Sequence, residues 1–277
     1  PVRNVDDGLR FLELAQREAL PWTCLGGGSN ILADDAGYAG LVMLVRTRDL
    51  ARSGDRIRAG AGWDLDALVT ATLDAGLTGL EFASGIPGTV GGAVVGNAGC
   101  YGHEIGELVR EAAVLRADGR IVRLDAGDFA FAYRTSALKE RGDVVLELEL
   151  ELARGDVAAA RATREAHLAD RRHKHPWDLP CAGSYFQNLP PSAPGERRRA
   201  AGQLLEAAGA KAMREGDAAV FARHANMIVN HGQARAADVL RLAGRMKDAV
   251  RERFGEELVE EVRHLALPGA SDDPAGE

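Results

Sequence analysis

Three consecutive glycines followed by two small polar residues form the first group in this sequence that could do chemistry. Gly26, Gly27 and Gly28 follow a short apolar run, and Ser29 and Asn30 come directly after them. Glycines can present a row of backbone N–H groups to an anion because no Cβ blocks its approach. The stretch lacks the Lys-Ser/Thr of a P-loop and the spacing of a Rossmann fingerprint. It therefore predicts either an anion-binding turn of another kind or a tight turn at the end of a strand.

A second glycine-rich stretch, Ser84 to Gly102, carries seven glycines and no charged residue. Such a stretch is too apolar for a solvated linker, and its glycines predict a long loop and not a core element. Its backbone N–H groups and the side chains of Ser84, Thr89 and Asn97 suit a ligand that carries phosphates and a flat ring. Two glycine loops in one half of the chain favour a dinucleotide bound across both over a purely structural role.

Hydrophobic periodicity predicts regular elements around these glycine stretches. Asp64 and Gly76 have the residue types that begin and end a helix. Strict alternation in Val144–Leu152 predicts a half-buried strand whose glutamates face water. In the first half we predict a helix over 6–20 capped by Asp6 or Asp7, a strand over 40–45, a helix from 64 to 76, a hairpin over 112–124 that turns at Asp118-Gly119, and this alternating strand.

The character of the chain changes near residue 152, from glycine-rich to charged and alanine-rich. The strands and helices do not repeat as βαβ units, so the expected fold class is α+β. We expect a domain over 1–152, a smaller domain over 153–268 and a disordered tail over 269–277. In the second half we predict helices over 154–174, 201–208 and 236–254, an exposed loop over 190–199, and a last strand over 258–267.

Composition narrows the class of protein. The chain has 277 residues, 46% of them hydrophobic, which suffices for two sizeable cores. Its net charge of -7 argues against a general nucleic-acid or anionic-membrane binder. Cys24, Cys100 and Cys181 lie far apart and outside any C-x-x-C pair, which argues against a disulfide scaffold or a zinc site. We therefore expect a soluble, cytoplasmic protein without a metal, and a monomer.

Five motifs together carry a family resemblance. In order, they are "LGGGSNIL", "GIPGTVGGAVVGNAG", "YRTSALK", "AGSYFQN" and "HANMIVN". The set resembles the UDP-N-acetylenolpyruvoylglucosamine reductase (MurB) family of peptidoglycan precursor synthesis, from about Asp6 to Leu267. Each motif alone would be weak, but the combination is highly specific. At this length, the chain is most similar to the shorter form of the family, which lacks a tyrosine-bearing loop that closes the site.

The resemblance implies an FAD domain like that of vanillyl-alcohol oxidase, built from two α/β subdomains, followed by a smaller α+β substrate domain. It implies FAD as cofactor and NADPH as electron donor. It also implies that both glycine stretches surround the FAD pyrophosphate and isoalloxazine. The implied cofactor-binding residues are Gly26, Gly27, Gly28, Ser29, Asn30, Ser84, Gly85, Ile86, Pro87, Gly88, Thr89, Gly91, Gly92, Ala93, Asn97 and Ala98.

The implied reaction transfers a hydride from flavin N5 to the terminal carbon of an enolpyruvyl ether on a UDP-sugar. Negative charge then builds next to the carboxylate, and this requires a cation and a proton donor. By resemblance, Ser184 is the proton donor and Arg134 pairs with the substrate carboxylate. Glu261 matches the acid of the family's C-terminal motif and would orient the intermediate or share in proton delivery, with Glu260 as the competing candidate.

Further residues are implied at the substrate. Tyr133 fits the family pattern around the arginine, and Asn188 and His224 are expected to hydrogen-bond the diphosphate or carboxylate of the substrate. His224 could equally be a buried structural histidine. The basic run Arg171–His175 is expected to be a solvated helix end, or a patch that meets phosphates.

Three departures from the family pattern bear on affinity and substrate. The family's Thr-Phe-x-x-Gly-Gly stretch would precede Pro1, and its absence would weaken FAD binding. Gln187 replaces the family's usual lysine. Glu215 and Asp217 stand where small or apolar residues are usual, and would repel a diphosphate if they faced the cleft.

These departures keep alternatives open. One is a related flavoprotein with a changed substrate in a biosynthetic pathway. Another is a non-catalytic nucleotide-binding relative, which would purify without a yellow chromophore. An FAD-linked oxidase ranks well behind the reductase, because an oxidase does not require the combination of Arg134, Ser184 and Glu261.

Overall fold

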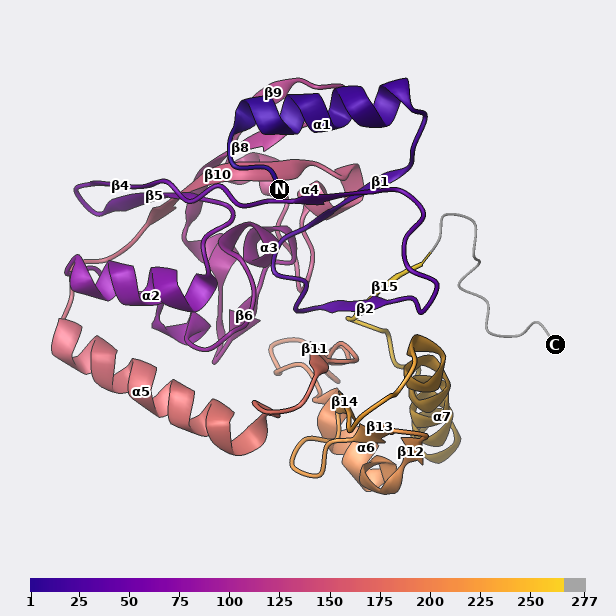
Figure 1. Cartoon of the computed structure of the whole chain (residues 1–277). Helices are drawn as coiled ribbons and strands as arrows, with labels where there is room; N and C mark the ends of the chain where they lie inside the picture. The colour runs from indigo at the N-terminus through magenta and orange to yellow at the C-terminus, as the bar shows by residue number, and fades with distance from the viewer. Residues whose placement is uncertain (267–277) are drawn as a thin grey trace. The chain divides into compact units, whose positions relative to one another are not determined.

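The computed structural model describes residues 1–266, and these divide into two compact units (Figure 1). Unit 1 comprises residues 1–28 and 40–171, and unit 2 comprises residues 29–39 and 172 onward. The expected boundary at 152/153 differs from this division. The long helix α5 (Val157–Lys174) belongs mainly to unit 1, and a short segment from the N-terminal half of the sequence belongs to unit 2. The tail over 269–277 lies outside the described residues.

Unit 1 is built around a two-stranded sheet and a five-stranded sheet. In the first, β1 (Trp22–Leu25) pairs in parallel with β3 (Leu41–Leu44). The second has the order β4-β5-β10-β8-β9 and is antiparallel throughout. Its strands are β4 (Leu50–Ser53), β5 (Arg56–Gly60), β8 (Val109–Leu115), β9 (Ile121–Asp125) and β10 (Val144–Glu151). The helices of this unit are α1 (Val5–Arg17), α2 (Leu65–Asp74), α3 (Val90–Val95), α4 (Ala137–Arg141) and α5, with a small hairpin of β6 (Gly99–Cys100) and β7 (His103–Glu104).

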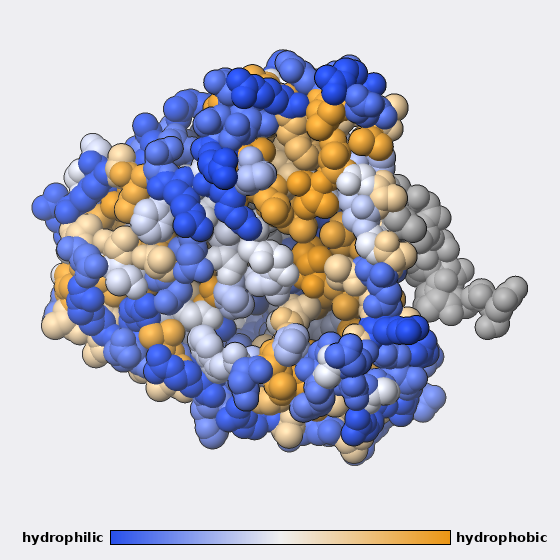
Figure 2. Space-filling view, in the orientation of Figure 1, coloured by the Kyte–Doolittle hydropathy of each residue, from blue (hydrophilic) through white to orange (hydrophobic). Residues whose placement is uncertain are grey.

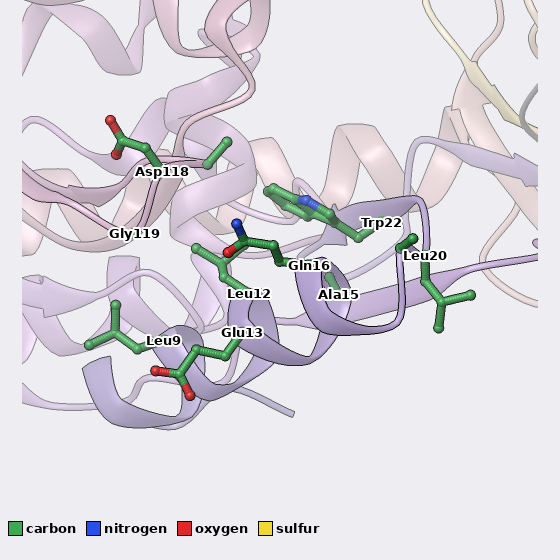
Figure 3. A pocket seen from close by; sticks show the side chains of 11 residues that line it. Leu9, Leu12, Glu13, Ala15, Gln16, Leu20, Trp22, Asp118 and Gly119 are labelled. Carbon is green, nitrogen blue, oxygen red and sulfur yellow. The ribbon is translucent and has the colours of Figure 1, made fainter.

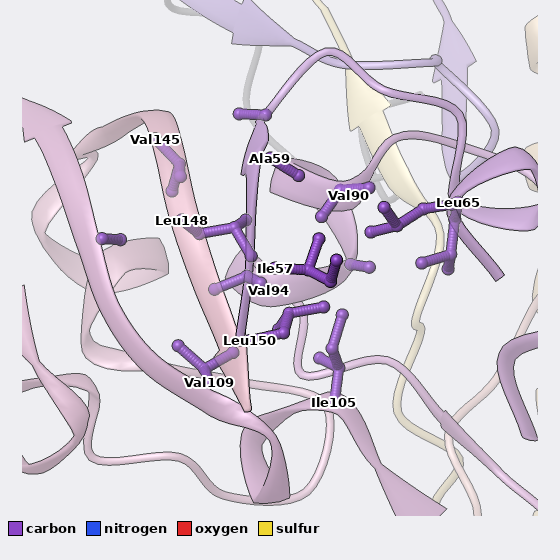
Figure 4. Packing of buried hydrophobic residues seen from close by; sticks show 14 of the residues in the cluster. Ile57, Ala59, Leu65, Val90, Val94, Ile105, Val109, Val145, Leu148 and Leu150 are labelled. Atoms are coloured by element: carbon purple, nitrogen blue, oxygen red, sulfur yellow. The ribbon is translucent and has the colours of Figure 1, made fainter. Parts of the chain in front are cut away.

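The core of unit 1 forms where one face of the five-stranded sheet meets α2 and α3 (Figure 4). Ile57 and Leu148 from the sheet lie against Val90 and Val94 of α3, and all four are at most 3% exposed. The second glycine stretch is therefore not a loop throughout. It contains helix α3, because its apolar residues at positions 90 and 94 recur at helical spacing and are buried on one face.

The alternating strand β10 also differs from expectation. It lies in the centre of the sheet, and its residue Glu149 is only 8% exposed. Arg56 Nη1 lies 2.9 Å and Arg58 Nη2 3.1 Å from the two carboxylate oxygens of Glu149. The expectation that its glutamates face water is therefore wrong at this position, because a central strand has neighbours whose long cationic side chains cover its polar face.

Unit 2 is built on a four-stranded antiparallel sheet of order β11-β14-β13-β12. A parallel pair, β2 and β15, joins the segment around residue 32 to the end of the described chain. The core gathers apolar side chains of α6 and α7 with the sheet. The elements are β2 (Ile31–Ala33), β11 (Cys181–Ser184), α6 (Ala201–Ala207), β12 (Arg214–Glu215), β13 (Ala218–Val220), β14 (Met227–Asn230), α7 (Ala236–Phe254) and β15 (Arg263–Leu265).

Most predicted elements are confirmed, and the α+β class with them. The helix predicted over 236–254 coincides with α7, and the one from Asp64 has that residue as its N-cap. The first helix instead begins after Asn4, whose side chain accepts a hydrogen bond from the N–H of Asp7 at 2.9 Å. The last strand is shorter than predicted, and its predicted end at residue 267 lies outside the described residues.

Candidate cofactor and substrate sites

The two glycine stretches of unit 1 touch each other. A Cβ on Gly26 would lie 2.2 Å from Thr89 Oγ1, and one on Gly27 would lie 2.9 Å from the Cα of Gly88. Real Cβ atoms do not approach other atoms so closely, so only glycine permits this contact. The close contact between the two stretches thus explains why residues 26 and 27 are glycines, and neither interpretation of the sequence predicted this contact. These glycines let two loops from distant parts of the sequence form one continuous surface.

The first loop presents free donors at this surface. Within the part of the chain that the structure describes, the N–H groups of Gly26, Gly27 and Gly28 donate no hydrogen bond to another group of the protein. Gly27 and Gly28 are exposed. The carbonyl of Gly26 accepts a hydrogen bond from Arg46 Nη1 at 2.9 Å, which turns the loop's acceptor inward. A row of exposed donors with a fixed backbone fits a phosphate or diphosphate group.

The polar side chains of the second stretch form hydrogen bonds with other groups of the protein. Ser84 Oγ donates to the carbonyl of Glu81 at 2.6 Å, and Thr89 Oγ1 accepts from the N–H of Gly92 at 3.3 Å. Asn97 Nδ2 donates to Glu104 Oε2 and to the carbonyl of Ala132, at 2.6 and 3.0 Å. These side chains therefore shape the loop, and a ligand would meet mainly its backbone.

The other predicted residues of this stretch divide between the core and the surface. Gly91 and Ala93 are buried in α3, and a Cβ on Gly91 would lie 2.7 Å from the Cβ of Ala61. Pro87 and Gly92 are exposed, and Ile86, Gly88 and Ala98 are half-buried. The packing of Gly91 and Ala93 thus supports the surface that the remaining residues form.

Asp66 is a supporting residue that sequence reasoning missed. One carboxylate oxygen accepts the N–H of Gly85 at 2.8 Å, and the other lies 2.7 Å from Arg164 Nη2 of α5. This carboxylate fixes the start of the second glycine stretch against two helices. No sequence signal marks it, because an acidic residue in the first turn of a helix ordinarily serves only the helix dipole.

Arg134 stands in a tight turn. Ala132 and Thr135 bond to each other in both directions, each N–H to the other's carbonyl at 3.1 Å, and Arg134 has a φ of +58°. This left-handed conformation is rare for a residue with a long side chain and marks a position held by its surroundings. Asn97 bonds to the carbonyl of Ala132, and Ser136 Oγ donates to the carbonyl of Val95 at 2.8 Å. The turn is therefore fastened to the C-terminal end of α3, and the ring of Tyr133 lies 5.3 Å from the guanidinium of Arg134.

Ser184 and Glu261 lie in unit 2 on neighbouring segments. Ser184 ends β11 and stands opposite Met227 of β14. The N–H of Glu261 donates to the carbonyl of Tyr185 at 2.7 Å, and Phe186 is paired with Glu260. Glu260 is exposed, and its carboxylate lies 3.5 Å from Lys247 Nζ of α7. The ion pair gives Glu260 a surface role, which favours Glu261 of the two predicted alternatives.

Asn30 and Ser29 belong to unit 2, apart from the glycines that precede them in sequence. Asn30 Nδ2 donates to the carbonyl of Glu261 at 2.9 Å, and the carbonyl of Asn30 accepts from the N–H of Arg263 at 3.1 Å. A Cβ on Gly183 would lie 3.9 Å from the carbonyl oxygen of Ser29. These two residues thus adjoin the segments that carry Ser184 and Glu261.

His224 and Asn188 border the same unit. Burial lowers the pKa of His224, and the positive charges of Lys174 and Lys211 act in the same direction. Its Nδ1 accepts the N–H of Asn226 at 3.3 Å, and the ring of His175 stands edge-on to it at 5.6 Å. Asn188 Oδ1 accepts the N–H of Ala201 at the start of α6. His224 is therefore half-buried and held by the backbone, with basic residues around it.

The unusual acids near residue 215 have partners within unit 2. The carboxylate of Glu215 lies 3.2 Å from both Arg241 and Arg245 of α7. Asp217 Oδ2 accepts the N–H of Gln233 at 2.8 Å. Both carboxylates thus interact with groups of unit 2, Glu215 with arginines of α7 and Asp217 with a backbone N–H.

A groove along α1 contains none of the predicted site residues (Figure 3). Leu12 and Trp22 contribute its apolar lining, and Asp118 and Gly119 of the β8–β9 turn lie across from the helix. Figure 2 shows apolar surface gathered beside α1. Leu20, which lines the groove, is 40% exposed. The polar lining of the groove consists of Glu13, Gln16 and Asp118, and the carboxylate of Asp118 is paired with Arg120.

Comparison with known families agrees with this arrangement. Residues 2–125 match the model of an FAD binding domain. Together with the two contacting glycine loops, this match identifies the chain as a flavoprotein of the FAD-dependent oxidoreductase class.

The family follows from the rest of the chain. Residues 175–265 match the C-terminal domain of UDP-N-acetylenolpyruvoylglucosamine reductase. This chain belongs to the UDP-N-acetylenolpyruvoylglucosamine reductase family, as the motifs predicted.

Individual relatives are similar over most of the chain. It is 44% identical to UDP-N-acetylenolpyruvoylglucosamine reductase 2 of Symbiobacterium thermophilum, over 92% of this chain and 81% of that protein. It is 45% identical to the corresponding reductase of Moorella thermoacetica, over 91% and 81%. The crystal structure of the reductase (MurB) from Thermus caldophilus has a TM-score of 0.79 and 33% identity, covering 96% of this chain and 91% of that one.

Proposed function

We propose that this chain reduces the enolpyruvyl ether of UDP-N-acetylglucosamine enolpyruvate to UDP-N-acetylmuramate, with NADPH as the electron donor. Family membership supports the reaction, and the exposed glycine donors of unit 1 fit the diphosphate of FAD. When bound, FAD supplies hydride transfer between NADPH and the terminal carbon of the enolpyruvyl group. The other steps belong to side chains of this protein.

Arg134 would pair with the substrate carboxylate. Its planar guanidinium offers two parallel donors, which match the two oxygens of a carboxylate and of the charge that develops beside it. The observation that carries this proposal is the turn at Ala132–Thr135, which Asn97 and Ser136 fasten to α3 of the second glycine stretch. A cation held in this way needs little reorganisation during the reaction.

Ser184 would give its hydroxyl proton to the carbon next to the carboxylate, completing the addition of one hydride and one proton across the double bond. A serine hydroxyl is a weak acid, but the intermediate is a strong base, so position matters more than acidity. Glu261 would orient the intermediate or share in returning a proton to Ser184. Tyr133, Asn188 and His224 would bind the substrate.

The cysteines and the helices of the chain bear on where the protein works. Within the described residues, Cys24, Cys100 and Cys181 form no disulfide. None of the helices within residues 1–266 has the length and apolar character needed to cross a membrane. We propose that the protein works in the cytoplasm, as a monomer.

The first experiment is an anaerobic titration of the purified protein followed by absorbance. We expect a flavin band that NADPH bleaches and that UDP-N-acetylglucosamine enolpyruvate restores. A band that bleaches but is not restored by this sugar would favour a changed substrate. A protein that takes up no flavin even after addition of FAD would contradict the proposal and favour a non-catalytic relative.

A further inference from the structure

Asn226 is a buried polar residue of unit 2 that the proposed reaction does not use. It directly precedes β14 and is 3% exposed. Its Oδ1 accepts the N–H of Phe186 at 2.9 Å, and its Nδ2 donates to the carbonyl of the same residue at 2.8 Å. A side-chain amide has the same donor and acceptor as a peptide group, so Asn226 occupies the place of a neighbouring strand.

The backbone of Asn226 extends this pairing. Its carbonyl accepts the N–H of Tyr185 at 2.8 Å, next to the residues held by the side chain. Phe186 is 1% exposed, so water cannot replace these bonds. On this edge, the segment immediately after Ser184 is therefore held by the side chain and the backbone of Asn226.

The opposite edge of the same segment holds the second predicted acid. The carbonyl of Tyr185 accepts the N–H of Glu261 at 2.7 Å, and the N–H of Gln187 donates to the carbonyl of Val259 at 2.8 Å. The segment from Ser184 to Gln187 thus lies between Asn226 on one side and the chain before β15 on the other. A shift of this segment would move Ser184 and Glu261 together.

We propose that Asn226 is a positioning residue for proton delivery, which acts by holding the segment that carries Ser184 and that binds the backbone of Glu261. This inference rests on the proposed roles of those two residues. Asn226 itself has both side-chain groups engaged by Phe186, and so it acts through its neighbours and not on the substrate. Displacement of a reacting group by about 1 Å can slow a reaction about 100-fold, which sets the size of the expected effect.

The test compares Asn226→Ala with a matched control, Asn230→Ala, in the FAD-loaded protein. Asn230 is the last residue of β14, and its side chain likewise bonds backbone, because its Oδ1 accepts the N–H groups of Gly232 and Ala234. Each flavin half-reaction is measured separately by anaerobic stopped flow. We expect Asn226→Ala to slow reoxidation of the reduced enzyme by the enolpyruvyl substrate about 100-fold, while bleaching by NADPH stays within about 2-fold. Asn230→Ala should leave both rates within about 2-fold.

A double-mutant cycle then separates positioning from general loss of structure. If Asn226 acts through Ser184, the combination with Ser184→Ala should lose much less than the product of the two single effects. The combination of Asn230→Ala with Ser184→Ala should give the simple product. Multiplicative losses for Asn226, or equal slowing of both half-reactions, would overturn the inference.

Three further outcomes are distinguishable. Should Asn226→Ala fail to fold, Asn226→Asp keeps the acceptor for Phe186 N–H but replaces the donor with an oxygen, and the same pattern is expected from it. A wild-type enzyme that NADPH bleaches but this substrate does not reoxidise would count against the proposed function. A full reoxidation rate in Ser184→Ala alone would remove the proposed role of Ser184, and this inference with it.

Discussion

Glu260 and Glu261 are adjacent in sequence, and at the scale of single residues their partners separate them. Glu260 is paired with Lys247 on the surface, whereas the backbone of Glu261 is held from two sides, by Tyr185 and by Asn30. Arg134 is held differently, by a left-handed turn bonded to α3. In each case the residue type suits the proposed chemistry. The hydrogen bonds of the surrounding backbone fix the position of Glu261 and of Arg134.

Arg134→Lys tests the role of the planar guanidinium. Lysine has a Cβ like arginine, so both residues bear the same cost of a φ of +58°, and the change isolates the head group. We expect turnover to fall by about 10- to 100-fold, because a point charge cannot replace two parallel donors. FAD content per protein, from the absorbance spectrum, should be unchanged. A loss of FAD in proportion to activity would indicate that Arg134 serves the cofactor instead.

His224 gives a prediction for stability against pH. Its pKa in the folded protein is lowered by burial below the ordinary value of 6.5, so the unfolded chain binds the proton more readily. Its contribution to stability is therefore complete above about pH 6.5 and is lost as the pH falls below that value. His224→Gln should reduce the fall in Tm between pH 7 and pH 5, compared with wild type. The exposed His173→Gln is the control, and the same reduction in it would contradict the assignment.

At the scale of elements, the two glycine loops are matched to each other before any ligand binds. The contact of Gly27 with Gly88 brings together two segments that are about sixty residues apart in the sequence. Arg46 and Asp66 then fix one loop each, through the carbonyl of Gly26 and the N–H of Gly85. The surface that the two glycine stretches form is thus a product of loop packing, supported by the core beneath α3.

Gly27→Ala tests this packing. Its Cβ would lie 2.9 Å from the Cα of Gly88, and a backbone atom cannot move aside as a flexible side chain can. We expect a loss of stability of about 1–3 kcal/mol and at least a 10-fold weaker FAD affinity. Gly244→Ala is the matched control, since Gly244 lies inside helix α7 and a Cβ there meets nothing within 4 Å. Chemical denaturation and fluorescence titration with FAD give the two quantities. Normal FAD affinity in Gly27→Ala would show that the loops need not touch.

At the scale of the whole molecule, the chain has two units with separate cores, and the predicted residues are shared between them. Arg134 and the glycine loops belong to unit 1, whereas Ser184, Glu261 and His224 belong to unit 2.

Hydrogen exchange of the protein, measured with and without added FAD, tests whether the cofactor binds to unit 1. We expect FAD to slow exchange at residues 26–28, because their N–H groups donate no hydrogen bond within the described residues and would acquire acceptors. The turn at 215–217 should be unaffected, and protection centred on unit 2 would contradict the assignment of the cofactor to unit 1.

Periodicity and capping residues sufficed to predict the long elements. Helix α7 follows from apolar residues at helical spacing, and α2 from an aspartate at its start and a glycine after its end. Local rules failed where burial overrides them. The glycine-rich stretch around residue 90 folds as a helix because the core of unit 1 accepts its valines, and β10 keeps Glu149 buried because neighbouring strands supply arginines.

By itself, the sequence determined the family, the α+β class and the residue types that the chemistry requires, since these depend on local pattern and on motifs. Only the tertiary structure decided why Gly26 and Gly27 must be glycine, why Glu261 differs from Glu260, and which residues support them. Asp66, Arg46 and Asn226 lie far along the chain from the groups they hold. Their roles consist of hydrogen bonds from their side chains to backbone groups of distant segments, and such bonds exist only after the chain has folded.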